Sequence, residues 1–281
     1  MRRLLPALSA FVLLAGCAAN EAAEEPTAKA GTPKNSSAPP GLVDIGERSL
    51  FLDCRGSGSP TVVLEAGLTG DLRTWENVMP VVQKETRVCA YDRANIGRSE
   101  PAPTPRTAAD VVADLHALLA AAGEKPPYLL TGFSFGGLTT QLFAQKYPED
   151  VAGLVLVESN HPDEVEQFEA HLTPDQIAQD RQAVSENSEG IDVFESMRQV
   201  GAKQGLPSVP LVVVTAGKSE GWPPGWDPQL FDRLRAQQQA DLASLVPGGR
   251  QIIAKDSGHD VPAQQPQAIV DAIKTVLDAV G

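Results

Sequence analysis

The sequence predicts an α/β fold: a doubly wound, mostly parallel sheet of about eight strands, with helices on both faces and a helical lid insertion. Short apolar runs alternate with segments of helical periodicity, as in sheets whose parallel strands are joined by helices. The runs lack polar alternation, which indicates strands buried on both faces. With 281 residues, 42% of them hydrophobic, the chain can bury a full core in one domain.

The amino-terminal segment is not expected to belong to this core. Met1-Arg2-Arg3 is a short basic region, the stretch from Leu4 to Leu14 is mostly apolar, and small residues precede Cys17. This order resembles a bacterial lipoprotein signal, and the apolar stretch is short for a membrane span. We therefore expect a signal peptide over residues 1–16, lipidation at Cys17 and attachment to the outside of a bacterial membrane. A plain secretory leader is the alternative.

A flexible tether is predicted over residues 17–40, which are rich in Ala, Glu, Pro, Ser and Thr and show no apolar periodicity. The folded domain is then expected over residues 41–281. Cleavage before Cys17 removes two arginines and no acid, so the formal net charge of −13 falls by two, to −15. An acidic surface argues against nucleic acid as a partner and against a polybasic membrane dock. Membrane attachment would come from the lipid.

The elements of the domain follow in order. Residues 61–65 predict a buried strand, and residues 72–82 predict a helix with one apolar face. Thr107 and Asp110 form a capping-box pattern at the start of a helix that ends at Gly123. Later strands are predicted at residues 128–130, 154–158, 211–215 and 251–254, and a last helix carries Ile269, Ile273, Val276, Leu277 and Val280 at helical spacing.

A serine between two glycines is the strongest sign of chemistry in the chain. Ser134 lies in Gly132-Phe133-Ser134-Phe135-Gly136, where a predicted strand turns into a helix. A tight corner of this kind lifts the serine hydroxyl towards a base. Gly132 and Gly136 lack the Cβ atoms that would crowd the corner. The pattern predicts a catalytic nucleophile rather than an ordinary glycine-rich turn.

A serine nucleophile needs a histidine base, and His259 is the strongest candidate among the four histidines. It follows the last predicted strand, and loops at the carboxyl ends of parallel strands converge on one crevice. Two glutamates compete to orient the imidazole. Glu158 ends the strand that follows the helix beginning after Ser134, whereas Glu220 lies in the loop after the next strand. We favour Glu158 because rigid elements hold geometry better than loops, and Glu220 is the alternative acid.

An oxyanion hole requires backbone N–H groups aimed at the developing charge. The expected donors are Phe135, which follows the nucleophile, and Leu68, in the loop after the predicted strand at residues 61–65. His161, Trp222 and Trp226 are candidates for the pocket wall. The alternatives are a capping role for His161 and a structural rim for the tryptophans. The sequence contains no metal-ligand pattern and no nucleotide-binding loop, so we expect no cofactor.

Residues from about 159 to 209 interrupt the alternation of strands and helices. The segment is charged and Gln-rich, with helical stretches at residues 165–168 and 192–200. A long connection inside a compact domain is more often a functional lid than a slack loop. We therefore expect a lid here, with a solvated helical excursion as the alternative.

Taken in order, four motifs resemble the α/β-hydrolase family over roughly residues 42 to 280. They are Ala66-Gly67-Leu68, the segment from Tyr91 to Ser99, the Ser134 elbow and Ser257-Gly258-His259. Asn95 stands where the family usually has glycine, although asparagine also tolerates a left-handed φ. Ala66-Gly67 replaces the usual His-Gly pair. Family members carry the triad acid at either of two strand ends, so the resemblance leaves Glu158 and Glu220 open.

The resemblance also bears on the cysteines. It makes the runs containing Cys54 and Cys89 the second and fourth strands, which are neighbours in the family's sheet. Besides Cys17 these are the only cysteines, an even pair in a chain expected to be exported. We expect a disulfide between them, and two buried thiols are the alternative.

Together these features predict a serine hydrolase that cleaves carboxylic esters through an acyl-enzyme intermediate. The expected partners are a small-molecule ester and, through the lipid, a membrane. Amide, peptide or lactone hydrolysis by the same residues is the alternative. A non-catalytic envelope binding protein is disfavoured by the complete serine, histidine and acid set. Dehalogenase and epoxide hydrolase activities are disfavoured because those branches of the family use aspartate at the elbow.

Overall fold

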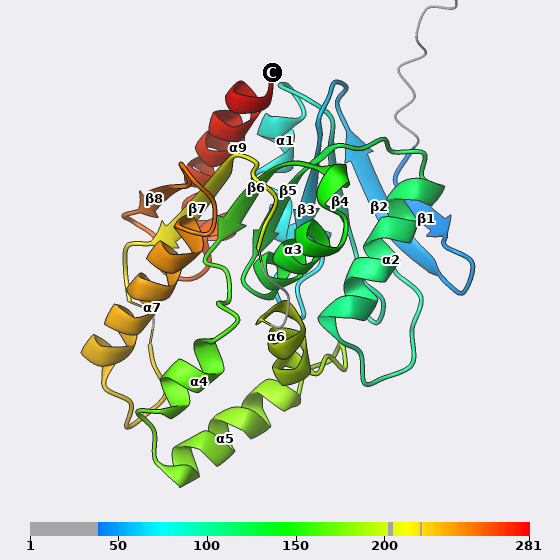
Figure 1. The fold of residues 1–281 in the computed structure, drawn as a ribbon. Helices are drawn as coiled ribbons and strands as arrows, with labels where there is room; N and C mark the ends of the chain where they lie inside the picture. Colours follow the sequence, from blue (N-terminus) through cyan, green and yellow to red (C-terminus); the bar gives the residue numbers. More distant parts are fainter. Residues whose placement is uncertain (1–38, 202–204, 220) are drawn as a thin grey trace, which may run out of the picture. The chain divides into compact units, whose positions relative to one another are not determined.

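A mixed sheet forms the centre of the computed structural model, which describes residues 39–201, 205–219 and 221–281. The predicted signal peptide, Cys17 and the tether up to residue 38 lie outside these ranges. The strand order in the described part is β1-β2-β4-β3-β5-β6-β7-β8. The strands are β1 (Gly41–Asp44), β2 (Ser49–Arg55), β3 (Thr61–Glu65), β4 (Val88–Tyr91), β5 (Tyr128–Phe133), β6 (Val151–Val157), β7 (Leu211–Ala216) and β8 (Arg250–Ala254) (Figure 1).

Only β2 runs against its neighbours. It pairs antiparallel with β1 and β4, and the other pairs are parallel. The predicted mostly parallel sheet of about eight strands is therefore confirmed. Because the other strands from β3 to β8 share one direction, their carboxyl ends, and the loops that follow them, meet at one edge of the sheet.

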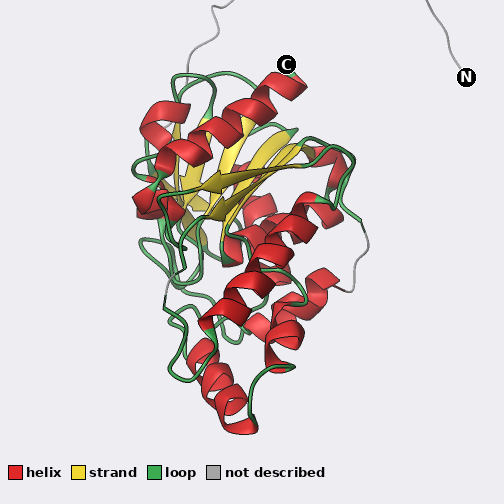
Figure 2. Ribbon diagram, turned by 90° about the vertical axis from the view of Figure 1, so that its left-hand side faces the viewer, coloured by secondary structure: helices red, strands yellow, loops and turns green. Residues whose placement is uncertain are grey.

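Helices cover both faces of the sheet, as predicted (Figure 2). One face packs against α2 (Ala108–Ala121), α3 (Phe135–Lys146) and α7 (Pro228–Ala243). The other packs against η1 (Leu72–Trp75), α1 (Met79–Val82) and α9 (Pro266–Val280). Two further short helices are η2 (Pro148–Asp150) and α8 (Val261–Gln264).

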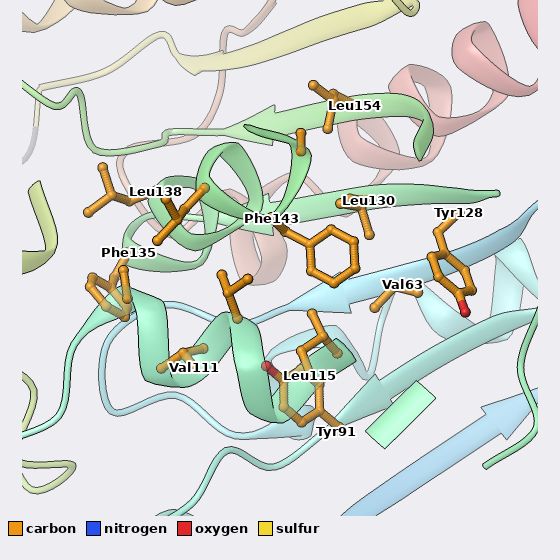
Figure 3. Packing of buried hydrophobic residues seen from close by; sticks show 14 of the residues in the cluster. Val63, Tyr91, Val111, Leu115, Tyr128, Leu130, Phe135, Leu138, Phe143 and Leu154 are labelled. Carbon is orange, nitrogen blue, oxygen red and sulfur yellow. The ribbon is translucent and has the colours of Figure 1, made fainter. Parts of the chain in front are cut away.

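The strand β3 shows why the predicted strands are apolar throughout. Val63 packs with Leu130 in the cluster beneath α2 and α3 (Figure 3). Val62 and Leu64, which point to the opposite face, pack in the cluster that includes α9. Alternate residues of a strand point to opposite faces, so a sheet covered on both sides needs apolar residues at every position.

The prediction of one continuous helix over residues 72–82 is wrong. The structure has a 3₁₀ helix, η1, followed by the separate short helix α1. Pro80 lies in the first turn of α1, where its missing N–H costs nothing, but it cannot continue a helix arriving from η1.

Two further helices, α5 (Pro174–Ser185) and α7, are not among the elements predicted from the sequence. Each begins with a capping residue followed by proline, which is a typical helix start.

The segment between β6 and β7 contains three helices in its described part, α4 (Glu164–Glu169), α5 and α6 (Val193–Gly201). α6 packs against α2 and α3, with Met197 and Val200 in their core cluster. α4 meets α7 in a separate aromatic cluster built around Phe168 and Phe231. Within the described ranges, no helix combines the length and apolar character needed to cross a membrane.

Cys54 and Cys89 form a disulfide, which confirms the predicted pairing. The two cysteines occupy directly paired positions on the antiparallel strands β2 and β4. The bond therefore ties the one antiparallel strand to the parallel part of the sheet.

We expect removal of this disulfide to destabilise the fold without changing its architecture. The bond closes a loop with a sequence separation of 35 residues. The chain-entropy model assigns such a crosslink about 4 kcal/mol of unfolding free energy. The measurement is urea unfolding of wild type and a Cys54→Ala/Cys89→Ala double variant under oxidising conditions. Coincident unfolding midpoints would contradict the expectation.

Candidate active site

Ser134 occupies the corner between β5 and α3 in a conformation that serine rarely adopts. Its φ is 54° and its ψ is −121°. Such backbone strain persists only where surrounding contacts hold it. The Ser134 N–H donates to the carbonyl of Val157 at 3.0 Å, and its carbonyl accepts from Gly137 at 2.9 Å and from Asn160 at 3.2 Å. The end of β6 and the first turn of α3 therefore fix the corner from both sides.

The two glycines around Ser134 are required by close backbone contact. A Cβ atom on Gly132 would lie 2.2 Å from the carbonyl oxygen of Gly136. A Cβ atom on Gly136 would lie 2.3 Å from the carbonyl oxygen of Glu65. No side chain fits at either position, so the glycines allow β5, α3 and the end of β3 to converge on the serine.

Glu158 and His259 come together although they lie far apart in the sequence. Glu158 directly follows β6, with a φ of 42°, and its side chain is 1% exposed. Its Oε2 atom lies 3.4 Å from Nδ1 of His259, and its Oε1 atom accepts the N–H of Ala216 at 2.7 Å. The structure therefore places the favoured acid beside the histidine. The alternative acid, Glu220, lies outside the described residues.

The surroundings of Glu158 favour its charged form. Burial raises the pKa of this carboxyl, but the hydrogen bond with His259, the charge of Arg235 and the N–H of Ala216 outweigh burial. The pKa of Glu158 is consequently held below its ordinary value. A carboxylate that is charged at neutral pH can stabilise a neighbouring imidazolium.

Arg235 is a third member of this group that no motif in the sequence indicates. It projects from α7, and its Nη1 atom lies 3.0 Å from Oε2 of Glu158 and 3.2 Å from Nδ1 of His259. Its guanidinium carbon lies 5.4 Å from the centre of the Trp222 ring. Burial acts to lower the pKa of Arg235, but acidic neighbours including Glu158 raise it above its ordinary value. The capping sequence at the start of α7 could have predicted the helix, but not its register against Glu158.

Ser134 and His259 line the same cavity, whose volume is about 480 Å³. The ring of His259 also lies 5.0 Å from that of Phe133, the residue before Ser134. The other residues that line this cavity are Gly67, Leu68, Arg73, Thr74, Glu76, Asn77, Phe133, Asp260 and Ala263. Ser134, His259 and Leu68 therefore face a common space at the carboxyl edge of the sheet.

Both expected oxyanion donors lie next to Ser134. Phe135 is the first residue of α3, where the N–H groups of the first turn have no partner within the helix. Leu68 follows Gly67, and a Cβ atom built on Gly67 would lie 3.3 Å from the Cβ atom of Ser134. The loop after β3 therefore lies against the serine.

The remaining pocket candidates occupy different places. His161 is buried, accepts the N–H of Asp163 through Nδ1 at 3.1 Å, and is not among the residues lining the Ser134 cavity. Trp226 is buried in the aromatic cluster, where its ring stacks on Trp222 at 5.9 Å. Trp222 lines a second cavity of about 620 Å³, which His259 also borders.

One group of potential metal ligands lies close together in the described part of the chain, formed by Cys54, Cys89 and Glu124. The disulfide engages both sulfur atoms of this group. Metal binding by cysteine requires free thiolates, so this group does not fit a metal ion.

Comparison with known proteins supports the fold described above. Residues 60–214 match the family model described as the alpha/beta hydrolase fold. The chain is 29% identical over 230 residues to the Bacillus subtilis protein named "Uncharacterized protein YqjL", covering 79% of this chain and 85% of that protein. The fold is similar to a thermophilic esterase from Thermogutta terrifontis, at a TM-score of 0.60 and 22% identity over 83% of this chain and 94% of that one.

A further solved structure with the same fold is the enol-lactonase from Burkholderia xenovorans LB400. Its TM-score is 0.59 at 16% identity, and the match covers 85% of this chain and 100% of that one. The family match spans more than half of the sequence, and it includes the elbow, Glu158 and the loop after β3. The chain belongs to the alpha/beta hydrolase fold family.

Proposed function

We propose that this hydrolase cleaves carboxylic esters of small molecules, with Ser134 as nucleophile, His259 as base and Glu158 as the orienting acid. The observation that carries the proposal is that Ser134, on its strained corner, and His259, paired with Glu158, line one cavity. A serine and a histidine that line one cavity, with the histidine paired to a carboxylate, match the roles required for acyl transfer.

The proposed reaction has two halves. The Oγ atom of Ser134 attacks the ester carbonyl while Nε2 of His259 takes the hydroxyl proton, and Glu158 stabilises the imidazolium through Nδ1. The N–H groups of Leu68 and Phe135 stabilise the oxyanion of the tetrahedral intermediate. Collapse expels the alcohol, which receives the proton from His259. Water then attacks the acyl-enzyme with the same proton transfers and releases the acid.

The polar lining of the cavity favours substrates with a short acyl chain over those with a long one. Arg73, Thr74, Glu76, Asn77 and Asp260 are polar residues that line the space beside Ser134. A long alkyl chain would leave these groups without water or hydrogen-bond partners. Lactone hydrolysis is a second candidate, because a lactone is a cyclic ester and an enol-lactonase shares this fold.

Replacement of Ser134 should abolish ester hydrolysis, because the attacking atom is lost. We expect Ser134→Ala to lower kcat/KM for p-nitrophenyl acetate by at least about a thousandfold, leaving only the small acceleration due to binding and the oxyanion hole. Wild type should also prefer the acetate to the octanoate. The measurement is release of p-nitrophenol, with thermal melts to verify folding. Substantial activity in a folded Ser134→Ala variant would refute the assignment.

Glu158→Gln should keep the fold but lower kcat by roughly three to four orders of magnitude, as loss of a triad carboxylate does elsewhere. The amide keeps the shape of the side chain but cannot stabilise the imidazolium. Glu220→Gln is the matched control, because Glu220 is the alternative acid. Its expected effect is small and mainly on KM. A severe loss in Glu220→Gln, with near-normal turnover in Glu158→Gln, would transfer the role to Glu220.

We propose in addition that a lipid on Cys17 attaches the exported protein to a membrane. The support is the basic, apolar and small-residue order of the leader. A diacyl group supplies enough apolar surface for stable anchoring, which a single chain does not. Cys17→Ser should therefore move the protein to the soluble fraction or leave it unprocessed, as measured by membrane fractionation and palmitate labelling. Unchanged partitioning without label in wild type would argue against the anchor.

A further inference from the structure

Arg93 lies at the centre of a buried ionic cluster next to the proposed oxyanion hole. Its side chain is 3% exposed, and those of Glu65 and Glu189 are 2% and 1% exposed. Nε and Nη2 donate to the two oxygens of Glu189, at 2.8 Å and 2.6 Å, and Nη1 donates to Glu65 at 2.6 Å. Tyr91 donates its hydroxyl to the other oxygen of Glu65 at 2.5 Å.

The same guanidinium also holds the backbone of the loop after β3. Nη1 donates to the carbonyl oxygen of Ala66, and Nη2 donates to that of Gly67, each at 2.6 Å. These two bonds complete the five N–H donors that a guanidinium offers. Glu189 accepts the N–H of Thr69 with Oε1, the oxygen that also accepts from Nη2 of Arg93. The cluster therefore grips the chain on both sides of Leu68.

These backbone hydrogen bonds also fix the direction of the Leu68 N–H. In a planar trans peptide, the carbonyl of Gly67 and the N–H of Leu68 point in opposite directions. Because Arg93 binds the Gly67 carbonyl on the buried side, the Leu68 N–H must point away from the cluster. Leu68 and Ser134 line the same cavity, in which a reacting ester would lie.

We propose that Arg93 and Glu189 are positioning residues that aim the Leu68 N–H at the oxyanion. The inference rests on the proposed function, since the oxyanion forms only when Ser134 attacks a carbonyl. Glu189 belongs to the loop between α5 and α6, so the segment between β6 and β7 contributes to the site by supporting the oxyanion loop. Asn95 secures this loop by donating its side-chain N–H to the Glu189 carbonyl at 2.9 Å.

The charge and the shape of this pair both matter. Replacing Glu189 by glutamine leaves Arg93 with one fewer buried anion and supplies one acceptor oxygen where the carboxylate has two. Three donors, two from Arg93 and the N–H of Thr69, then compete for that oxygen. Lysine in place of Arg93 keeps the charge but lacks the planar fork that reaches both carbonyls and both carboxylates. Either change frees the 66–69 loop to turn the Leu68 N–H.

The experiment compares Glu189→Gln and Arg93→Lys with a matched control, Glu124→Gln. Glu124 forms a comparable two-bond pair with Arg87, at 2.8 Å and 2.6 Å, at the opposite edge of the sheet. The readouts are kcat and KM for p-nitrophenyl acetate and the affinity of butylboronic acid, whose tetrahedral adduct with Ser134 places an oxygen in the oxyanion hole. We expect kcat and boronate affinity to fall together about 10- to 100-fold in the two site variants, with KM changed less than about threefold.

The control should lose stability but keep wild-type kcat and boronate affinity. Unchanged kcat and boronate affinity in a folded Glu189→Gln or Arg93→Lys variant would overturn the inference, as would an equal loss in Glu124→Gln. Should both site variants fail to fold, the ¹⁵N-leucine spectrum of wild type decides. The Leu68 amide proton should shift downfield on boronate binding, and no shift would overturn the inference. Wild type that neither hydrolyses the ester nor binds boronate refutes the proposed function instead.

Discussion

Close backbone contact between the first turn of α3 and the end of β3 is the constraint on which the site depends. Gly136 lies so near the Glu65 carbonyl that no Cβ atom fits between them. The contact brings the loop that contains Leu68 against the corner that carries Ser134. Glu65, at the end of β3, also binds Arg93, so the same strand anchors the ionic cluster behind the loop at residues 66–69. Ser134 and the two proposed oxyanion donors, Leu68 and Phe135, thus share one rigid support.

The acid side of the site is built differently. Glu158 is held by the Ala216 N–H from β7, by Arg235 from α7 and by its contact with His259. Arg235 and His259 both contact Oε2 of Glu158. The carboxylate therefore interacts with a permanent cation and with a histidine that becomes charged during the proposed reaction. This arrangement keeps Glu158 ionised despite its burial. It also couples the histidine to the position of α7.

Much of this could be predicted from local patterns. The strands, the elbow, the histidine loop and the disulfide follow from apolar runs, glycine spacing and the resemblance to a known family. Arg235 and Glu189 could not be predicted, because neither lies in a motif and their contacts with Glu158 and Arg93 depend on where the fold places α7 and the loop between α5 and α6. Spacing along the chain carries no information about such contacts. The break between η1 and α1 could have been predicted from the sequence, because Pro80 cannot continue a helix.

The central claim is that Ser134 is an activated nucleophile in the shared cavity. The most direct measurement is reaction of the wild-type protein with a fluorophosphonate, followed by peptide mapping with mass spectrometry and an assay of residual ester hydrolysis. We expect one adduct, on Ser134, formed in proportion to the loss of activity. A protein modified fully at another residue, or one that keeps its activity with Ser134 blocked, would contradict it.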